Sequence, residues 1–368
     1  MEIITNTSTN LSDYDPTSNN TSRRSGFSQT VTIPLVLTST ILVIIINFII
    51  CRIIIKKKEF HTSTFYLLFN MAISDCFIMV AAFLLIGNNY IASIQVWSSA
   101  TLMVVCKITP SLNAVSLVSS TYTLAAISIE RHYTLISKVR NRSLFKTRKR
   151  LTIVIAATWL IGLIMAIPML FIATYTPKTP WMCNIINISL AFNVGYFMSL
   201  LVVAYIIPLI IMIIMYSKII HFLTNNLMTN QNTPSPVYQN NRKRHTRIIA
   251  MLIIATVLFF LFCFPLFISF IIVALSGLDF AIYFSAITPR QVAILQAAFL
   301  ITVIACIQNP IIYFSFMPAF RQAFPCYDLY RRNKINNWKF MSSNQITPDT
   351  VQSKDQLHSL SQTTPASG

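Results

Sequence analysis

Seven long apolar runs constrain this chain more than any other feature of its sequence. They cover residues 31–55, 62–90, 102–136, 150–174, 194–222, 246–275 and 290–316. A helix needs roughly 20 predominantly apolar residues to cross a bilayer, and each run is long enough. Strands of a membrane barrel are about ten residues of alternating polarity, whereas these runs are solidly apolar. The sequence therefore predicts an all-α membrane protein, a bundle of seven transmembrane helices.

Cationic residues predict how the bundle is oriented. They gather in alternate connections between the runs: Lys56, Lys57, Lys58, Lys138, Arg140, Arg142, Lys146, Arg148, Lys149, Arg150, Arg242, Lys243, Arg244, Arg247, Arg321, Arg331, Arg332 and Lys334. By the positive-inside rule these connections are cytoplasmic, so the N-terminus is expected outside and the C-terminus inside. Topology accounts for most of the net charge of +18. A nucleic-acid partner would need a basic stripe on a soluble domain and is not expected.

The polar ends of the chain complete the predicted organisation. Residues 1–30 are expected to form an extracellular, glycosylated tail before the bundle at 31–316. Five N-x-S/T sequons fall on the predicted outer side, at Asn6, Asn10, Asn19, Asn20 and Asn187. A short amphipathic helix parallel to the membrane is expected over 317–332, and a disordered cytoplasmic tail over 333–368.

Cysteine positions suggest one disulfide. Only Cys106 and Cys183 fall at predicted outer positions, where an oxidising environment permits pairing. We expect these two to pair; the alternative is two unrelated thiols. The four cysteines within apolar runs are interpreted as small buried hydrophobic residues; they are Cys51, Cys76, Cys263 and Cys306.

The segment SIERHYTLI, Ser128 to Ile136, ends the third run and resembles a known family. Rhodopsin-like G-protein-coupled receptors end their third span in an acid, an Arg and Tyr or a substitute, with a cysteine twenty-five residues before the Arg. Here Arg131 follows Cys106 by twenty-five residues. NMAISD in the second run and NPIIY at the end of the seventh match other marks of the family. The resemblance extends from the first span to beyond the last.

The resemblance implies a switch for G-protein coupling near the cytoplasmic ends. In the resting state Glu130 would hold Arg131. In the active state Arg131 would be released toward Tyr216, Tyr313 and an inserted G-protein helix. The residues given to this switch are Glu130, Arg131, Tyr216, Asn309, Pro310 and Tyr313. The alternative is an interfacial Arg that only anchors its helix.

Asp75 is the only acid deep within a run, and a buried ionisable group in a membrane is functional by default. The resemblance implies a sodium pocket formed by Asp75, Ser120 and Asn309. Ala305 and Cys306 stand where the family has polar groups, which weakens the expected sodium site. No other cofactor and no structural metal site is expected.

Two ligand classes of the family lack their marker here. Amine receptors carry an Asp seven residues after the third-span cysteine, where this chain has Asn113, and opsins carry a retinal-binding Lys where it has Val303. The third run, with Cys-Lys-x-x-Pro and then an amide, resembles the neuropeptide-receptor branch. We therefore expect an extracellular peptide ligand; a lipid or another small molecule is the competing class. The expected pocket comprises Asn113, Leu117, Trp181, Phe264, Phe267, Phe270, Gln296 and Phe299.

The cytoplasmic side is expected to engage a heterotrimeric G protein, and the tail, once phosphorylated by a receptor kinase, arrestin. Cys326 is a candidate palmitoylation site. A transporter would show several intramembrane ionisable groups or repeats, and an enzyme would show paired acids or a nucleophile with its base. The sequence has neither pattern, so a plasma-membrane receptor is predicted. A seven-span scaffold that does not signal stays an alternative.

One departure from the family pattern predicts activity without ligand. His245 stands where many relatives carry an acid that pairs with the third-span Arg, so that second latch is missing. We expect basal G-protein signalling above that of mock-transfected cells. A G-protein activation assay on cells expressing the chain without ligand measures it, and a signal equal to the mock control contradicts the prediction.

Overall fold

The computed structural model describes residues 29–93, 97–136, 145, 147–177, 183–229 and 236–323. Several predicted sites lie outside these ranges: Asn6, Asn10, Asn19, Asn20, Trp181 and Cys326. Most of the predicted N-terminal tail and the whole C-terminal tail also lie outside them.

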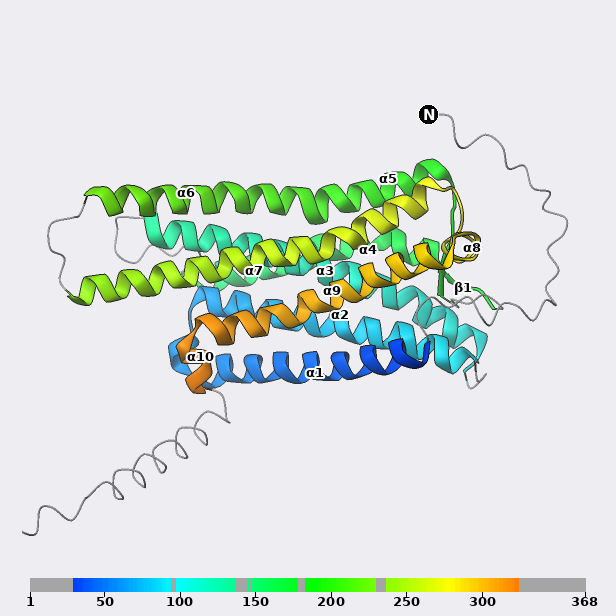
Figure 1. The fold of residues 1–368 in the computed structure, drawn as a ribbon, viewed down its shortest axis with the longest axis horizontal. Helices are drawn as coiled ribbons and strands as arrows, with labels where there is room; N and C mark the ends of the chain where they lie inside the picture. Colours follow the sequence, from blue (N-terminus) through cyan, green and yellow to red (C-terminus); the bar gives the residue numbers. More distant parts are fainter. Residues whose placement is uncertain are drawn as a thin grey trace, which may run out of the picture. The chain divides into compact units, whose positions relative to one another are not determined.

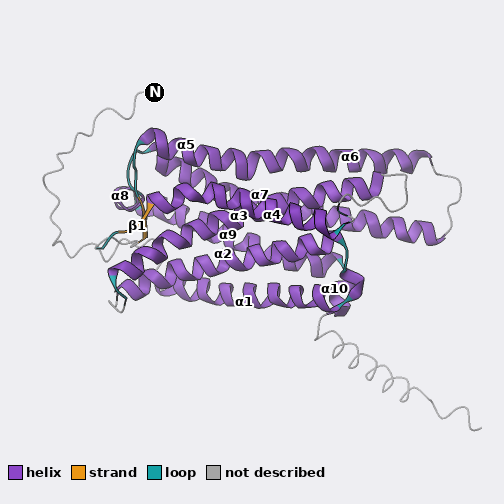
Figure 2. Cartoon of the chain, turned by 180° about the vertical axis from the view of Figure 1, so that it is seen from behind, coloured by secondary structure: helices purple, strands orange, loops and turns teal. Residues whose placement is uncertain are grey.

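Seven helical spans run alongside one another (Figures 1 and 2), as the apolar runs predict. They are α1 (Gln29–Lys56), α2 (Ser63–Ser93), α3 (Ser99–Ile136), α4 (Arg148–Ile172), α5 (Leu190–Leu201) continued by a π turn η3 (Val202–Ile206) and α6 (Ile207–Thr229), α7 (Pro236–Leu275), and α9 (Pro289–Phe316). α3 packs against α2, α4, α6 and α7, and α9 packs against α7, α1 and α2. The predicted seven-helix fold is confirmed.

The short elements lie between these spans. A 3-10 turn η2 (Lys58–Phe60) follows α1, and the strands β1 (Ala173–Tyr175) and β2 (Cys183–Ile185) separate α4 from α5. The helix α8 (Phe280–Ala286) precedes α9. The strands pair antiparallel, with Thr174 opposite Asn184. We call the end of the bundle with the strands the disulfide end, and the opposite end, where α1 and α3 finish, the basic end.

Residues 317–368 form a separate unit. Within it, α10 (Pro318–Ala323) occupies only the beginning of the predicted amphipathic helix. The backbone N–H groups of Phe320 and Arg321 donate to the carbonyl of Met317, at 3.0 and 3.4 Å. This six-residue helix gives the predicted eighth helix weak support.

Large apolar side chains are exposed over the outside of the bundle. On α4 they include Ile153, Leu160, Leu163, Ile164, Ile167 and Phe171, the last 67% exposed. In water such a surface would drive aggregation, because contiguous apolar patches of this extent are rare on soluble monomers. In hydrocarbon the same surface needs no cover. The exposure pattern therefore matches a lipid-facing exterior.

Buried polar side chains bond one another where α2, α3 and α4 meet. The amide of Asn70 accepts from the indole N–H of Trp159 at 2.9 Å and donates to the hydroxyl of Thr123 at 2.8 Å. One turn further along, Ser119 contacts the hydroxyls of Ser74 and Thr158 at 3.4 and 3.2 Å. No water is available in the hydrocarbon core to satisfy these groups. The bonds therefore fix which faces of the three helices meet.

The π turn between α5 and α6 has a local cause. Pro208, the second residue of α6, has no backbone N–H and cannot donate to the carbonyl four residues earlier. The chain adds a residue to this turn instead, and the N–H of Ile207 donates to the carbonyl of Val202. Pro265 and Pro310 lie inside α7 and α9. Each of these two prolines also lacks the backbone N–H that would complete the helical hydrogen-bond pattern.

Gly162 of α4 sets how closely that helix approaches α3. A Cβ added there would lie 2.6 Å from the carbonyl oxygen of Val115, closer than real Cβ contacts. At Gly195 of α5, no atom lies within 4 Å of the added Cβ. Gly162 is therefore required by packing and Gly195 is not.

This difference predicts opposite results for the same substitution. Gly162→Ala should destabilise the detergent-solubilised protein by about 1–3 kcal/mol, the usual cost of overpacking. Gly195→Ala should be neutral or slightly stabilising, because alanine is the better helix former. Thermal unfolding of the two purified variants measures the difference. Equal melting temperatures would show that α4 can move away from α3 without cost.

Candidate functional site

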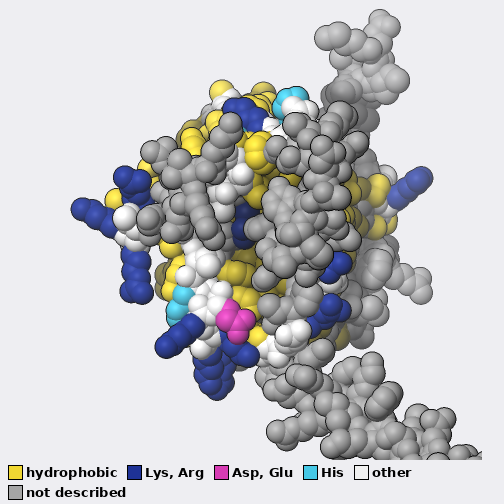
Figure 3. All heavy atoms as spheres, turned by 90° about the vertical axis from the view of Figure 1, so that its left-hand side faces the viewer, with side chains coloured by type: hydrophobic (Ala, Val, Ile, Leu, Met, Phe, Trp, Pro, Cys, Tyr) yellow, Lys and Arg dark blue, Asp and Glu magenta, His cyan; other side chains and the backbone are white. Residues whose placement is uncertain are grey.

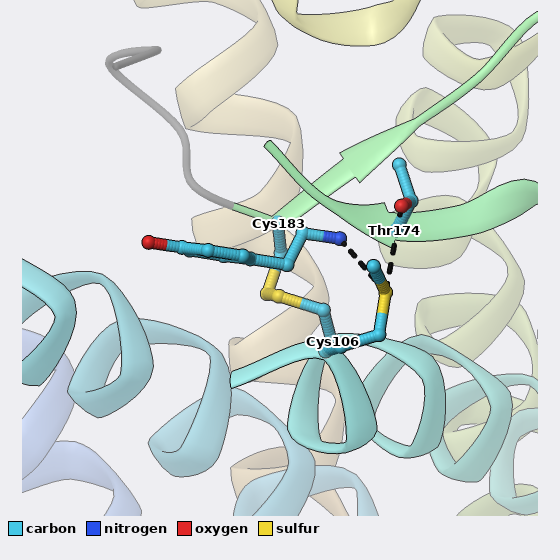
Figure 4. The surroundings of a disulfide bond; sticks show 5 residues. Cys106, Thr174 and Cys183 are labelled. Atoms are coloured by element: carbon cyan, nitrogen blue, oxygen red, sulfur yellow. Dashed lines mark hydrogen bonds between the residues drawn. A yellow bond between two sulfur atoms is a disulfide. The ribbon is translucent and has the colours of Figure 1, made fainter. Parts of the chain in front are cut away.

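A disulfide between Cys106 of α3 and Cys183 of β2 anchors the strands at one end of the bundle. The predicted pairing is confirmed. The thioether of Met103, one turn before Cys106, accepts from the Thr174 hydroxyl at 3.5 Å and from the Tyr175 N–H at 3.4 Å. The dashed lines in Figure 4 mark both contacts beside the disulfide. Each strand is thus tied separately to the beginning of α3.

The segment after Cys183 is also bonded to the connection between α7 and α8. The side-chain oxygen of Asn184 accepts from the backbone N–H of Ala281 at 2.9 Å. The Asp279 carboxylate accepts from the backbone N–H of Asn187 at 2.7 Å, and the amide nitrogen of Asn187 donates to the carbonyl of Gly277. Gly277 has φ +70, which favours glycine over residues with a side chain. We call the set Asn184, Asn187, Gly277, Asp279 and Ala281 the outer clasp.

The clasp bears on the predicted glycosylation of Asn187. N-glycans attach to the side-chain amide nitrogen, which here donates to Gly277. The side-chain oxygen of Asn187 is buried and has no hydrogen-bond partner within the described structure. This arrangement does not favour a glycan at Asn187. Glycosylation of the other four sequons stays a prediction.

The predicted pocket residues divide into two aromatic groups. Phe270 of α7 stacks on Phe197 of α5 with ring centroids 5.1 Å apart, and meets Phe299 of α9 edge-on at 5.9 Å. Phe267, one turn below Phe270, packs instead against Tyr205 of the π turn at 5.3 Å. The structure therefore brings Phe270 and Phe299 together and places Phe267 in a different cluster.

Phe264 differs from the prediction. Its side chain is 46% exposed on the outside of α7, tilted toward Tyr205 at 6.0 Å, and this position does not favour a role in the pocket. The neighbouring residue of α7, Cys263, is buried.

Three predicted pocket residues are not aromatic. Asn113 of α3 is half-buried, and Leu117 follows it by one helical turn on the same face and is buried. The side-chain oxygen of Gln296 on α9 is buried and accepts no hydrogen bond within the described residues. A buried acceptor without a donor costs free energy until something donates to it. Gln296 is thus the polar group here that most needs a ligand or a water molecule.

A second polar group lies in the core. The carboxylate of Asp75 accepts from the Ser120 hydroxyl at 3.3 Å and from the Asn309 amide nitrogen at 3.0 Å. The predicted trio from α2, α3 and α9 does come together. The side-chain oxygen of Asn309 has no hydrogen-bond partner in the described part of the chain, so it could serve a cation. Ala305 and Cys306 are buried without adding oxygen donors, so the fit to sodium is incomplete.

At the basic end, the carboxylate of Glu130 accepts from the backbone N–H of Phe145 at 3.3 Å. The carbonyl of Phe145 accepts from the Ser63 hydroxyl at 3.1 Å, so this loop residue joins the ends of α2 and α3. The Arg131 Nε atom is buried without a hydrogen-bond partner among the described residues. The sequence did not predict the role of Phe145, because no residue pattern marks a backbone N–H in a loop as the partner of an acid.

The two tyrosines of the predicted switch are engaged elsewhere. The Tyr216 hydroxyl lies 3.3 Å from that of Thr256 on α7, and the Tyr313 hydroxyl donates to the Met71 thioether of α2 at 3.6 Å. Both side chains are buried. The switch residues therefore surround the ends of α3, α6 and α9, where Tyr216 contacts α7 and Tyr313 contacts α2.

A family model described as "7 transmembrane receptor (rhodopsin family)" matches residues 46–313. The chain belongs to this family. It is therefore a multi-pass protein of the plasma membrane and a receptor rather than an enzyme.

Individual relatives are distant. A QRFP-like peptide receptor from Branchiostoma floridae is 25% identical over 320 residues, covering 83% of this receptor and 78% of that protein. The tachykinin-like peptides receptor 99D of Drosophila melanogaster is 26% identical over 301 residues, covering 76% and 53%. A D(2)-like dopamine receptor from Takifugu rubripes is 24% identical over 187 residues, covering 50% and 38%.

The outer clasp yields a prediction for this receptor. Asp279→Ala removes the acceptor for the Asn187 N–H, so this amide should exchange with deuterium about tenfold faster, in line with the loss of a charged hydrogen bond. Asp279→Asn keeps a carbonyl oxygen at the same place and is the matched control. Hydrogen exchange of the purified receptor measures both. An alanine variant that exchanges like the wild type would refute the contact.

Proposed function

We propose that this protein is a cell-surface receptor for a neuropeptide and that it signals to a heterotrimeric G protein. Membership of the rhodopsin family supports the coupling. The peptide ligand is supported by two relatives named as peptide receptors, which match over most of this chain. The dopamine-receptor relative does not favour an amine, because Asn113 has no charge to pair with an ammonium group.

The proposed orientation places the disulfide end outside and the basic end in the cytoplasm. Two independent observations support it. The Cys106–Cys183 bond requires an oxidising compartment. Lys56, Lys58 and Arg148 lie at the opposite end, where the positive-inside rule places the cytoplasm. Figure 3 views that end, with dark blue cationic side chains around it and only a small magenta acidic area.

The main support for a peptide ligand is a buried amide oxygen that lies beside a group of aromatic side chains. The side-chain oxygen of Gln296 is a buried acceptor with no donor among the described residues, and Gln296 lies one turn before Phe299 of the aromatic group with Phe270 and Phe197. A peptide offers N–H donors together with apolar side chains, which suits such a surface. The hydrocarbon chain of a lipid would pack against the aromatic side chains but would offer no donor to the Gln296 oxygen. The peptide is therefore the better fit.

The proposed mechanism is a change of partners at the basic end. Glu130 is held by the Phe145 N–H, and Tyr216 and Tyr313 contact Thr256 and Met71. Activation would break the contact of Tyr216 with α7 and free both tyrosines to meet Arg131. The bundle then has two packings, and a ligand shifts their populations only by binding one of them more tightly.

Other partners follow the same proposal. Phosphorylation of the C-terminal tail by a receptor kinase would recruit arrestin, and Cys326 would carry a palmitoyl group. Sodium would bind weakly at Asp75, because Ala305 and Cys306 add no oxygen donors there.

Arg131→Ala tests the proposed function. In cells screened against a panel of amidated neuropeptides, the variant should lose G-protein activation by at least tenfold while it keeps peptide binding. The reason is that Arg131 serves the G-protein side and not the ligand side. Arg150→Ala, which removes an exposed cation from the same end, is the matched control and should signal normally.

Two results would contradict the proposal. Full activation by the Arg131 variant would remove Arg131 from the switch. Silence of the wild type across the panel, with normal surface expression, would favour a lipid ligand or a scaffold that does not signal.

A further inference from the structure

One face of α6 changes its chemistry along its length. Ile207, Ile214, Lys218, His221 and Asn225 follow one another at intervals of seven, four, three and four residues. At 3.6 residues per turn these intervals place all five on one face of the helix. Ile207 and Ile214 are 40% and 44% exposed, and the other three are exposed as well. The face therefore presents apolar side chains in the middle of the span and polar side chains at the basic end, where Lys218 is cationic.

A hollow lies beside the polar part of this face. It has a volume of about 320 Å³ and is formed by His132 and Ile136 of α3 with Lys218, His221, Phe222 and Asn225 of α6. This volume lies at the lower end of the range of roughly 300–1,000 Å³ found for small-molecule sites. We call it the α3–α6 hollow.

The residues around the hollow favour a negatively charged ligand. Lys218 carries a positive charge, and the two histidines add imidazole donors. The Nδ1 atom of His132 is buried and has no hydrogen-bond partner in the described structure. His221 Nε2 and the Asn225 amide nitrogen lie 3.0 Å apart. No acidic side chain is among the described residues that line the hollow.

One class of ligand would match both the apolar part and the polar part of this α6 face. A phospholipid joins an anionic phosphate to apolar chains. The hollow lies at the ends of the spans formed by α3 and by α5 and α6, so a headgroup would meet Lys218 while its chains followed Ile214 and Ile207 toward the middle of the membrane. Basic pockets between transmembrane helices on the cytoplasmic side bind such headgroups.

We propose that the α3–α6 hollow binds the phosphorylated headgroup of an anionic phospholipid of the inner leaflet. The proposal rests on the proposed orientation, because the cytoplasmic leaflet is the one that carries anionic lipid. A soluble inositol phosphate presents the same phosphate groups without the chains. Lys218 and His221 would contact the phosphates, and Ile214 the first carbons of a chain.

Binding of a fluorescent phosphatidylinositol bisphosphate to the purified, full-length receptor in phosphatidylcholine nanodiscs tests this proposal without peptide or G protein. The double variant Lys218→Gln/His221→Gln should bind the probe at least fivefold more weakly, because loss of the Lys218 charge costs about that factor and loss of His221 also removes a hydrogen-bond donor. The matched control Lys57→Gln/His61→Gln removes the same residue types from exposed positions at the same end and should change binding by less than twofold. Lys218→Arg, which keeps the charge, should retain binding.

Equal weakening by both double variants would overturn the proposal, because it would show general attraction to the basic end. Unchanged binding in the Lys218/His221 variant would also overturn it. Inositol trisphosphate alone competing as strongly as the lipid would show a soluble-phosphate site, with no part for the chains. An antibody against an N-terminal tag on intact cells tests the orientation separately, so failure of the orientation and failure of the hollow are distinguishable.

Discussion

Polar groups inside this bundle must find their partners within the protein, because the hydrocarbon around it offers none. Most of the arrangement of α2, α3 and α4 depends on that constraint. Asn70 joins Trp159 to Thr123, and Ser119 joins Ser74 to Thr158. Apolar side chains alone would not define which faces meet, since the lipid is as apolar as the core. The close approach of Gly162 to Val115 is possible only in that register.

α3 is fixed to other parts of the protein at both of its ends. The disulfide fixes its beginning to β2, and Glu130 fixes its last turns to Phe145. Between them, Ser120 contributes to the Asp75 group. The helix is thus bonded at its beginning, its middle and its end, and the Tyr216 hydroxyl of α6 contacts the Thr256 hydroxyl of α7 at 3.3 Å. The proposed mechanism requires α6 and α7 to separate there, which would break this contact.

The sequence predicted those features of the fold that depend on the length of apolar runs and on the positions of motif residues. Hydrophobic length gave the seven spans, and counting cysteines on one side gave the Cys106–Cys183 pair. It could not predict contacts made by loop backbone, such as Phe145 with Glu130 or Asn187 with Asp279, because any residue carries an N–H. It also could not predict which of Cys263 and Phe264 faces the interior, since adjacent positions on a helix differ by 100° in direction and only packing decides which one is buried. Cys263 is the buried one.

The outer clasp connects these observations to ligand binding. β2 is bound covalently to α3, paired with β1 after α4, and hydrogen-bonded to the connection that begins at the end of α7. Phe270 lies on α7 between this clasp and Pro265, and its aromatic neighbours Phe197 and Phe299 belong to α5 and α9. In the proposed mechanism, a ligand that packs against Phe270 acts on a helix that is held at its outer end by the clasp and that lacks one backbone N–H donor at Pro265. A shift of α7 at Phe270 would have to reach its basic half, where Thr256 meets Tyr216 and the Ala255 carbonyl accepts from the Gln308 amide of α9 at 3.2 Å.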